Sequence, residues 1–168
     1  MAKIFFFIFN FSILLYGDSI SKAELYTLKK NSFACYENKD YPNCTESFRK
    51  LIEYSSEPKL KLYLAISLFN SNNLEIPEKS DDIFIRNEKI KLIRNHYLEI
   101  SNLLSDYLSF VEERKFKEPN ISEYYFLLAI SKYYSGNKKQ AVYYFQKIRL
   151  DKKYSEKIRY NIALIEAE

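Results

Sequence analysis

Glycine is scarce in this chain of 168 residues, where it occurs only as Gly17 and Gly136. Phosphate-binding loops and dinucleotide-binding turns need several glycines close together, so the sequence excludes both kinds of nucleotide site. Proline is also rare, with four residues, whereas Leu, Ile, Lys and Glu are abundant. This composition favours helices over the turn-rich strands of a β protein, and we therefore expect an all-α fold.

Histidine occurs once, as His96, and a single imidazole supplies neither a catalytic triad nor a metal cage. The acidic pairs Asp81–Asp82 and Glu112–Glu113 lie at an expected helix start and on a charged face, where capping and solvation explain them. The net charge of +4 is mild, and basic residues alternate with acidic ones, which argues against a nucleic-acid partner. We expect no enzyme activity, no metal and no cofactor.

The N-terminal segment 1–23 has the pattern of a secretory signal peptide. Lys3 precedes an apolar run over residues 4–16, which is shorter than the roughly 20 residues needed to span a bilayer. Ser21 and Ala23 would occupy the −3 and −1 positions of a cleavage site before Glu24, and residues 17–19 offer an earlier site. We therefore expect export to a bacterial periplasm or cell envelope. The alternative is an uncleaved anchor, which alone would attach the chain to a membrane.

The segment 122–151 predicts two helices joined by a turn at Gly136. Apolar residues recur at steps of three and four on both sides of the turn: Tyr125, Leu128, Ala129 and Tyr133, then Ala141, Phe145 and Ile148. Aligned on the glycine, this segment resembles a tetratricopeptide (TPR) repeat, in which small residues let two helices approach and aromatic residues fill the space beside them.

The resemblance covers most of the chain after the signal segment. It places Lys39 at the turn-glycine position of an earlier repeat, and Leu64–Ser67 repeats the sequence of Leu128–Ser131. It implies one domain over 24–168, a right-handed solenoid of helical hairpins with one long inserted helix. The expected elements are a hairpin over 24–55, a helix over 58–72, the long helix over 81–117, a hairpin over 122–150 and a capping helix over 155–167.

The long helix departs from the repeat pattern. Its apolar residues alternate at steps of three and four and form a heptad seam: Ile90, Ile93, Tyr97, Ile100, Leu104, Tyr107 and Val111. We expect Pro119 to end it. The helix either packs inside the solenoid, in place of a missing second helix, or projects and pairs with a partner or another copy of the chain.

In the alignment with the repeat, Cys35 lies late in one helix and Cys44 early in the next, so the two face each other across the turn. An exported protein meets an oxidising compartment, and we expect a disulfide between them. The alternative is two buried thiols in packing positions. Two thiols without a nearby histidine do not suffice for a metal site.

TPR proteins bind a peptide or a helix in a concave groove lined by their inner helices. The corresponding positions are apolar or aromatic here, with Lys29, Lys59 and Glu123 near the rim. Asn is absent from the inner positions that bind carboxylates in some members, so recognition of chaperone C-termini is not expected. The long helix could instead cover these residues and make them core. The groove residues are Phe33, Tyr36, Leu62, Ile66, Phe69, Phe126, Ile130 and Tyr133.

The resemblance implies a non-catalytic adaptor that binds a segment of another protein in this groove, and the signal segment predicts that the adaptor is exported. One alternative is a structural subunit that forms homo-oligomers through the heptad seam. Another is an accessory component of an envelope enzyme system, such as cell-wall synthesis, that contributes no chemistry itself.

Overall fold

The computed structural model describes residues 20–71, 74–79 and 82–167, and in these ranges every regular element is a helix. The all-α prediction is confirmed. Residues 1–19, which carry most of the predicted signal segment, lie outside the described part of the chain. The helices are α1 (Lys22–Glu37), α2 (Tyr41–Tyr54), α3 (Pro58–Asn70), α4 (Ile83–Glu113), α5 (Ile121–Tyr134), α6 (Lys138–Lys147) and α7 (Ser155–Ala167).

The turns that follow α1 and α5 share one backbone conformation. Gly136 has a φ of 93°, and Lys39, which the alignment placed at the same position, has a φ of 59°. The backbone N–H of Lys39 donates to the carbonyl of Tyr36 at 3.0 Å, and that of Gly136 donates to Tyr133 at 2.9 Å. A residue with positive φ at this point satisfies the last carbonyls of the helix and reverses the chain.

A disulfide joins α1 to α2 across the first of these turns. It links Cys35 and Cys44, whose Cα atoms lie 5.6 Å apart. The side chain of Cys44 is fully buried. The predicted pairing is therefore present, and it fixes the end of α1 against the start of α2.

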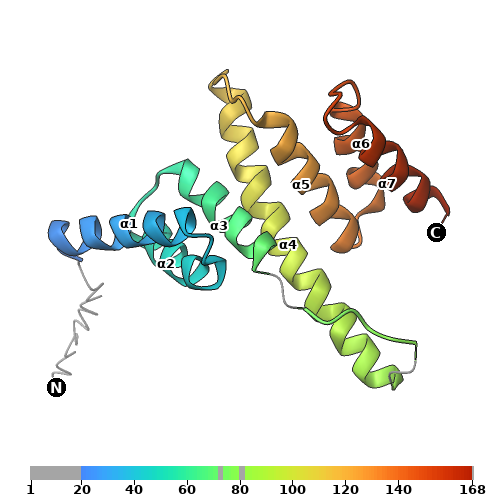
Figure 1. Cartoon of the computed structure of the whole chain (residues 1–168), viewed down its shortest axis with the longest axis horizontal. Coiled ribbons are helices and arrows are strands. Elements are labelled where there is room, and N and C mark those ends of the chain that lie inside the picture. The colour runs from blue at the N-terminus through green and yellow to red at the C-terminus, as the bar shows by residue number, and fades with distance from the viewer. Residues whose placement is uncertain (1–19, 72–73, 80–81, 168) are drawn as a thin grey trace, which may run out of the picture.

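Helices that follow one another in sequence also lie next to one another in space. Figure 1 shows α1–α3 on one side of the molecule and α5–α7 on the other, with α4 running obliquely between them. The principal helix contacts join α1 to α2 and continue pair by pair to α6 and α7. Fully buried side chains from five helices form the centre of the core: Phe48, Leu60, Leu104, Leu128 and Phe145.

The long helix α4 is shorter at both ends than the predicted range 81–117. It begins after Asp82, whose side chain accepts a hydrogen bond from the backbone N–H of Phe84 at 2.8 Å. It ends before Lys115, which has a φ of 51°. The expectation that Pro119 ends this helix was wrong, because a residue in the left-handed conformation closes it four positions earlier.

The heptad seam of α4 packs largely within the molecule. Its residues from Tyr97 to Val111 are buried, and Ile93 packs against the same core from a half-buried position. The first turn of α4 differs, because the side chains of Ile83 and Phe84 are 74% and 71% exposed. The helix therefore packs against the core over most of its length and leaves an apolar start uncovered.

Candidate protein-binding surface

Three aromatic side chains from α1 and α3 meet beside the disulfide. The ring of Tyr63 lies edge-on to Phe33 and to Tyr36, with centroid distances of 5.0 and 4.9 Å. It also stacks on Phe48, the fully buried ring of α2, at 5.6 Å. The three side chains from α1 and α3 are each partly exposed, so part of the group remains accessible to solvent. We call Phe33, Tyr36 and Tyr63 the aromatic face.

Charged and phenolic groups at the start of α5 act electrostatically on the aromatic face. Burial raises the pKa of Tyr36 to about 12, and the surrounding phenols and the carboxylate of Glu123 add to the shift. Tyr41, Tyr63 and Tyr124 are the phenols concerned. Tyr36 lies on α1, whereas Glu123 and Tyr124 lie on α5. Groups on helices distant in sequence therefore contribute to the pKa of the same phenol. Tyr36 stays protonated at neutral pH, as an ordinary tyrosine does, and the raised pKa extends this to more alkaline solution.

A second pair of tyrosines continues from the aromatic face into the core. Tyr107 of α4 lies edge-on to Tyr124, with ring centroids 5.9 Å apart. Its hydroxyl donates to Oε2 of Glu118 at 2.6 Å. Burial, followed by this hydrogen bond, raises the pKa of Tyr107 above its ordinary value. The Tyr107 hydroxyl is thus satisfied within the chain, and its bond to Glu118 connects α4 to the segment that precedes α5.

The predicted groove residues fall into separate groups. Leu62 is 1% exposed and belongs to the core, so it offers no surface to a partner. Phe69 joins a ring cluster with Tyr97, whereas Phe126 lies between Phe145 and Tyr154 in another cluster near α6 and α7. The other predicted groove residues are also half-buried and pack on the core: Phe33, Tyr36, Ile66, Ile130 and Tyr133.

Two of the three predicted rim charges, Lys29 and Glu123, form ion pairs within the chain. Lys29 binds Glu57 at 2.7 Å, and Glu123 lies 3.4 Å from Lys153. These pairs are exposed, so each contributes little to stability and remains available to rearrange around a partner.

Sequence reasoning missed Tyr63, which is central to the aromatic face. It chose Leu62, one position earlier, because the repeat alignment assigned that position to the inner side of the helix. A shift of one residue turns a helical side chain by about 100°, which exchanges a core residue for a surface one. The signal that could have found Tyr63 is its polar hydroxyl, since a buried tyrosine needs a partner whereas a leucine does not.

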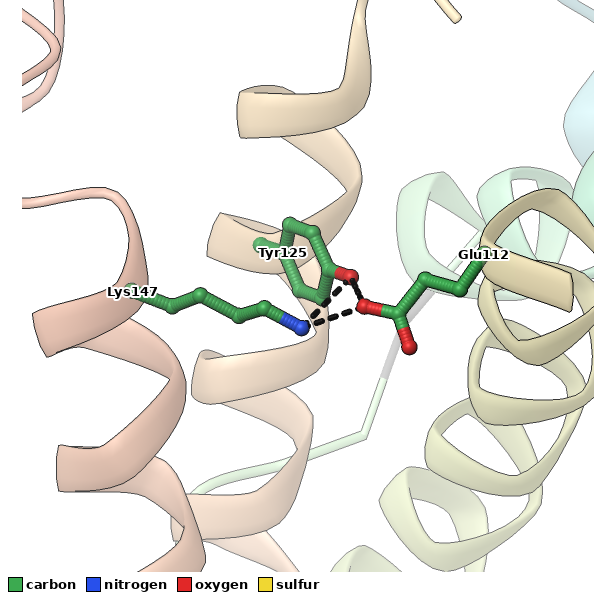
Figure 2. A network of polar contacts seen from close by, with 3 residues as sticks. All are labelled: Glu112, Tyr125 and Lys147. Atoms are coloured by element: carbon green, nitrogen blue, oxygen red, sulfur yellow. Dashed lines mark hydrogen bonds and ion pairs between the residues drawn. The ribbon is translucent and has the colours of Figure 1, made fainter. Parts of the chain in front are cut away.

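A polar network crosses α5 on another part of the molecule. Figure 2 shows the carboxylate of Glu112 from α4 directed at the hydroxyl of Tyr125 and the ammonium of Lys147, from α5 and α6. The Tyr125 hydroxyl donates to Glu112, and Lys147 forms an ion pair with the same carboxylate. Lys147 Nζ also donates to the Tyr125 hydroxyl at 2.9 Å and lies 4.3 Å from the ring centroid.

The contacts within this network fix the protonation states of its three side chains at neutral pH. Burial, followed by the hydrogen bond to Glu112, raises the pKa of Tyr125. The hydrogen bonds from Lys147 and Tyr125 lower the pKa of Glu112. At neutral pH the group is thus a carboxylate, a phenol and an ammonium, each satisfied by the others. The network links α4, α5 and α6. This structural role is sufficient to explain why the three side chains lie together.

Within the described ranges, no group of three or more His, Cys, Asp or Glu side chains is placed to hold a metal ion. Comparisons of this chain with protein-family models, with curated proteins and with solved structures each found no match.

Proposed function

We propose that this protein is an exported, non-catalytic adaptor that binds a segment of another protein on its aromatic face. The proposal includes a TPR-like, right-handed solenoid in which α1, α3 and α5 are the inner helices. The sequential packing of the helices and the matching turns at Lys39 and Gly136 support this arrangement.

The observation that carries the proposal is the half-buried ring cluster of the aromatic face. Phe33, Tyr36 and Tyr63 are fixed by contacts with one another and with the core, so a partner would not have to order them on binding. Rigid aromatic side chains with one exposed side are typical of the residues that dominate binding energy at protein interfaces.

The chemistry of the face favours an apolar partner segment with polar edges. The rings can bury aliphatic or aromatic side chains of a partner. Lys29 is exposed one helical turn before Phe33, and the exposed carboxylate of Glu123 acts electrostatically on Tyr36. An amphipathic helix or an extended apolar peptide fits these features.

The disulfide supports the location that we propose. A Cys35–Cys44 bond forms and persists in oxidising compartments, such as the periplasm or the outer envelope. In the ranges that the structure describes, no helix combines the length and the apolar character needed to cross a bilayer.

A pull-down from envelope extract tests the proposal when the wild-type chain is compared with Tyr63→Ala and Tyr36→Ala. Each substitution removes a ring from the aromatic face, and we expect a specific partner to be reduced at least tenfold, as for a residue that contributes more than about 1.4 kcal/mol to binding. Tyr143→Ala is the matched control, because this tyrosine of α6 is 57% exposed and outside the face. A partner that is retained by folded Tyr63→Ala, as judged by circular dichroism, would contradict the proposal.

The exposed start of α4 favours self-assembly as a second candidate function. The buried seam is not free to pair with another copy, but Ile83 and Phe84 leave apolar surface uncovered. Light scattering at increasing concentration would detect assembly, and Phe84→Glu should abolish it. A chain that stays monomeric at all concentrations would exclude this candidate.

A further inference from the structure

A cleft lies on a different part of the molecule from the aromatic face, in the corner between α4 and the turn that joins α5 to α6. Figure 1 shows the first half of α4 extending past this turn, with residues 74–79 running alongside it. The cleft has a volume of about 610 Å³. Its walls combine cationic and apolar side chains and include Arg86, Ile90 and Arg94 from α4 with Tyr134 from α5.

The charged side chains that line the cleft are all cationic among the residues described. Arg86, Arg94 and Lys138 line it, and no acidic side chain does so among the residues described. Within the described part of the chain, the guanidinium groups of Arg86 and Arg94 have no ion pair or hydrogen bond. A guanidinium is permanently charged and matches the geometry of a carboxylate. The cleft is therefore complementary to an anionic ligand.

The α4 wall has a regular pattern of charge and apolar surface. Arg86, Ile90 and Arg94 recur at steps of four, so they follow one another along one side of the helix. The two arginines are eight residues apart, which corresponds to about 12 Å along the helix axis. Ile90 lies midway between them. This wall presents a positive charge, an apolar patch and a second positive charge.

The opposite wall is held in place by ring packing. Tyr134 stacks on Tyr97, with centroids 4.7 Å apart and an angle of 24° between the planes. Tyr97 in turn lies edge-on to Phe69 of α3 at 6.0 Å. The rings therefore give the cleft a fixed aromatic side, against which an apolar ligand group can pack.

We propose that this basic cleft binds an acidic peptide in an extended conformation, with two carboxylates four residues apart and an aliphatic side chain between them. In an extended peptide, alternate side chains point the same way and four residues span about 13 Å, which matches the spacing of Arg86 and Arg94. The carboxylates would pair with the arginines, and the central side chain would lie on Ile90. This inference concerns a second surface and does not rest on the proposed function of the aromatic face.

Fluorescence polarisation with the full-length chain tests this inference, using a labelled peptide with the sequence Gly-Glu-Ser-Leu-Ser-Glu-Gly. We expect saturable binding that Arg86→Gln and Arg94→Gln each weaken about fivefold, as exposed charge pairs do. Replacing both Glu residues of the peptide by Gln should weaken binding by a larger factor, and replacing its Leu by Ser should also weaken it. Arg159→Gln on α7 is the matched control and should leave the affinity unchanged. Tyr36→Ala should also leave it unchanged, which separates this test from that of the aromatic face.

Several results would overturn the inference. One is the absence of binding at millimolar peptide by a chain whose circular dichroism shows it to be folded. Another is equal binding of the Glu and Gln peptides, or an equal loss in Arg159→Gln, since both would indicate non-specific attraction. Binding to vesicles of anionic phospholipid through Arg86 and Arg94, without binding of the peptide, would assign the cleft to a membrane surface. A dimer that Arg86→Gln dissociates would assign it to a second copy.

Discussion

The ring of Tyr97 on α4 stacks on Tyr134 at the end of α5, with centroids 4.7 Å apart. Because Tyr97 also meets Phe69 edge-on, the rings connect α3, α4 and α5 at one point. The seam of α4 is thus occupied by contacts within the chain, and the position of Tyr134 beside the basic cleft is a consequence of core packing. The same ring packing therefore stabilises the fold and positions one wall of the basic cleft.

Reduction of the Cys35–Cys44 bond should lower the free energy of unfolding by about 2–3 kcal/mol, because the bond restricts a short loop of the unfolded chain. Urea denaturation with and without reductant measures this difference. The double variant Cys35→Ala and Cys44→Ala should lose a similar amount and become insensitive to reductant. An unchanged midpoint for the reduced wild-type chain would show that the bond contributes nothing to stability.

Substitution of Gly136 by Ala should destabilise the protein by about 1–2 kcal/mol. The strain comes from the backbone, since Gly136 has a φ of 93°, which residues with a Cβ atom rarely adopt. Space is not the cause, because an added Cβ would meet Arg94 Nε only at 3.9 Å, an ordinary contact. Thermal melting of Gly136→Ala beside Ser135→Ala checks this prediction. Equal melting temperatures would mean that the turn relaxes at no cost.

Stability should fall as the pH is lowered through about 6.5, in part because of His96. Burial lowers the pKa of this imidazole below the ordinary value of 6.5, opposed by Glu99 and by a hydrogen bond to the backbone of Leu68 and assisted by Arg49. The folded state therefore binds a proton less readily than the unfolded state. The stabilisation is present above pH 6.5 and is lost as the pH falls towards the lower pKa of the folded state.

Urea midpoints at pH 7.5 and 5.5 measure this dependence, and His96→Gln should reduce the difference between them. Nε2 of His96 is buried and has no hydrogen-bond partner in the described part of the chain. The two pH values are compared within each protein, because the variant also loses the hydrogen bond to the backbone of Leu68. A larger pH difference in His96→Gln than in the wild type would contradict the sign of this argument.

The network around Tyr125 should contribute to stability above about pH 4.5 and lose that contribution in acid. The pKa of Glu112 is lowered by its hydrogen bonds with Lys147 and Tyr125, so folding favours the carboxylate. Because Glu112 is 53% exposed, solvent screens the pair and we expect Glu112→Gln to cost at most about 1 kcal/mol at pH 7. Added salt should reduce that cost. The exposed pair Lys50–Glu46 provides the control, through Glu46→Gln.

The helices were largely predictable because the signals for them are local. The apolar spacing around Gly136 and the alignment of Lys39 with a turn glycine locate two reversals that the structure shows. The end of α4 was not predictable in the same way. Lys115 carries no preference for positive φ, so the proline four residues later was the stronger signal in the sequence.

The candidate surface was only partly predictable. The choice of Leu62 over Tyr63 shows why, since which of two adjacent side chains points inward depends on how α3 rotates between α2 and α4. That rotation is set by tertiary packing, which a single sequence does not reveal. The basic cleft was not found at all, because Arg86 and Gly136 are 50 positions apart and meet only through the crossing of α4 and α5.

The stepwise packing of helices, each on the next in the chain, also bears on how this protein folds. Contacts between neighbours in sequence close short loops, and proteins dominated by them fold quickly. Loss of structure should begin at α7, whose main helix contact is with α6, and should reach α3 and α4 last. Amide hydrogen exchange should therefore be graded from the ends to the centre. The disulfide would slow opening at the α1 end, so that the two ends of the molecule would exchange at different rates.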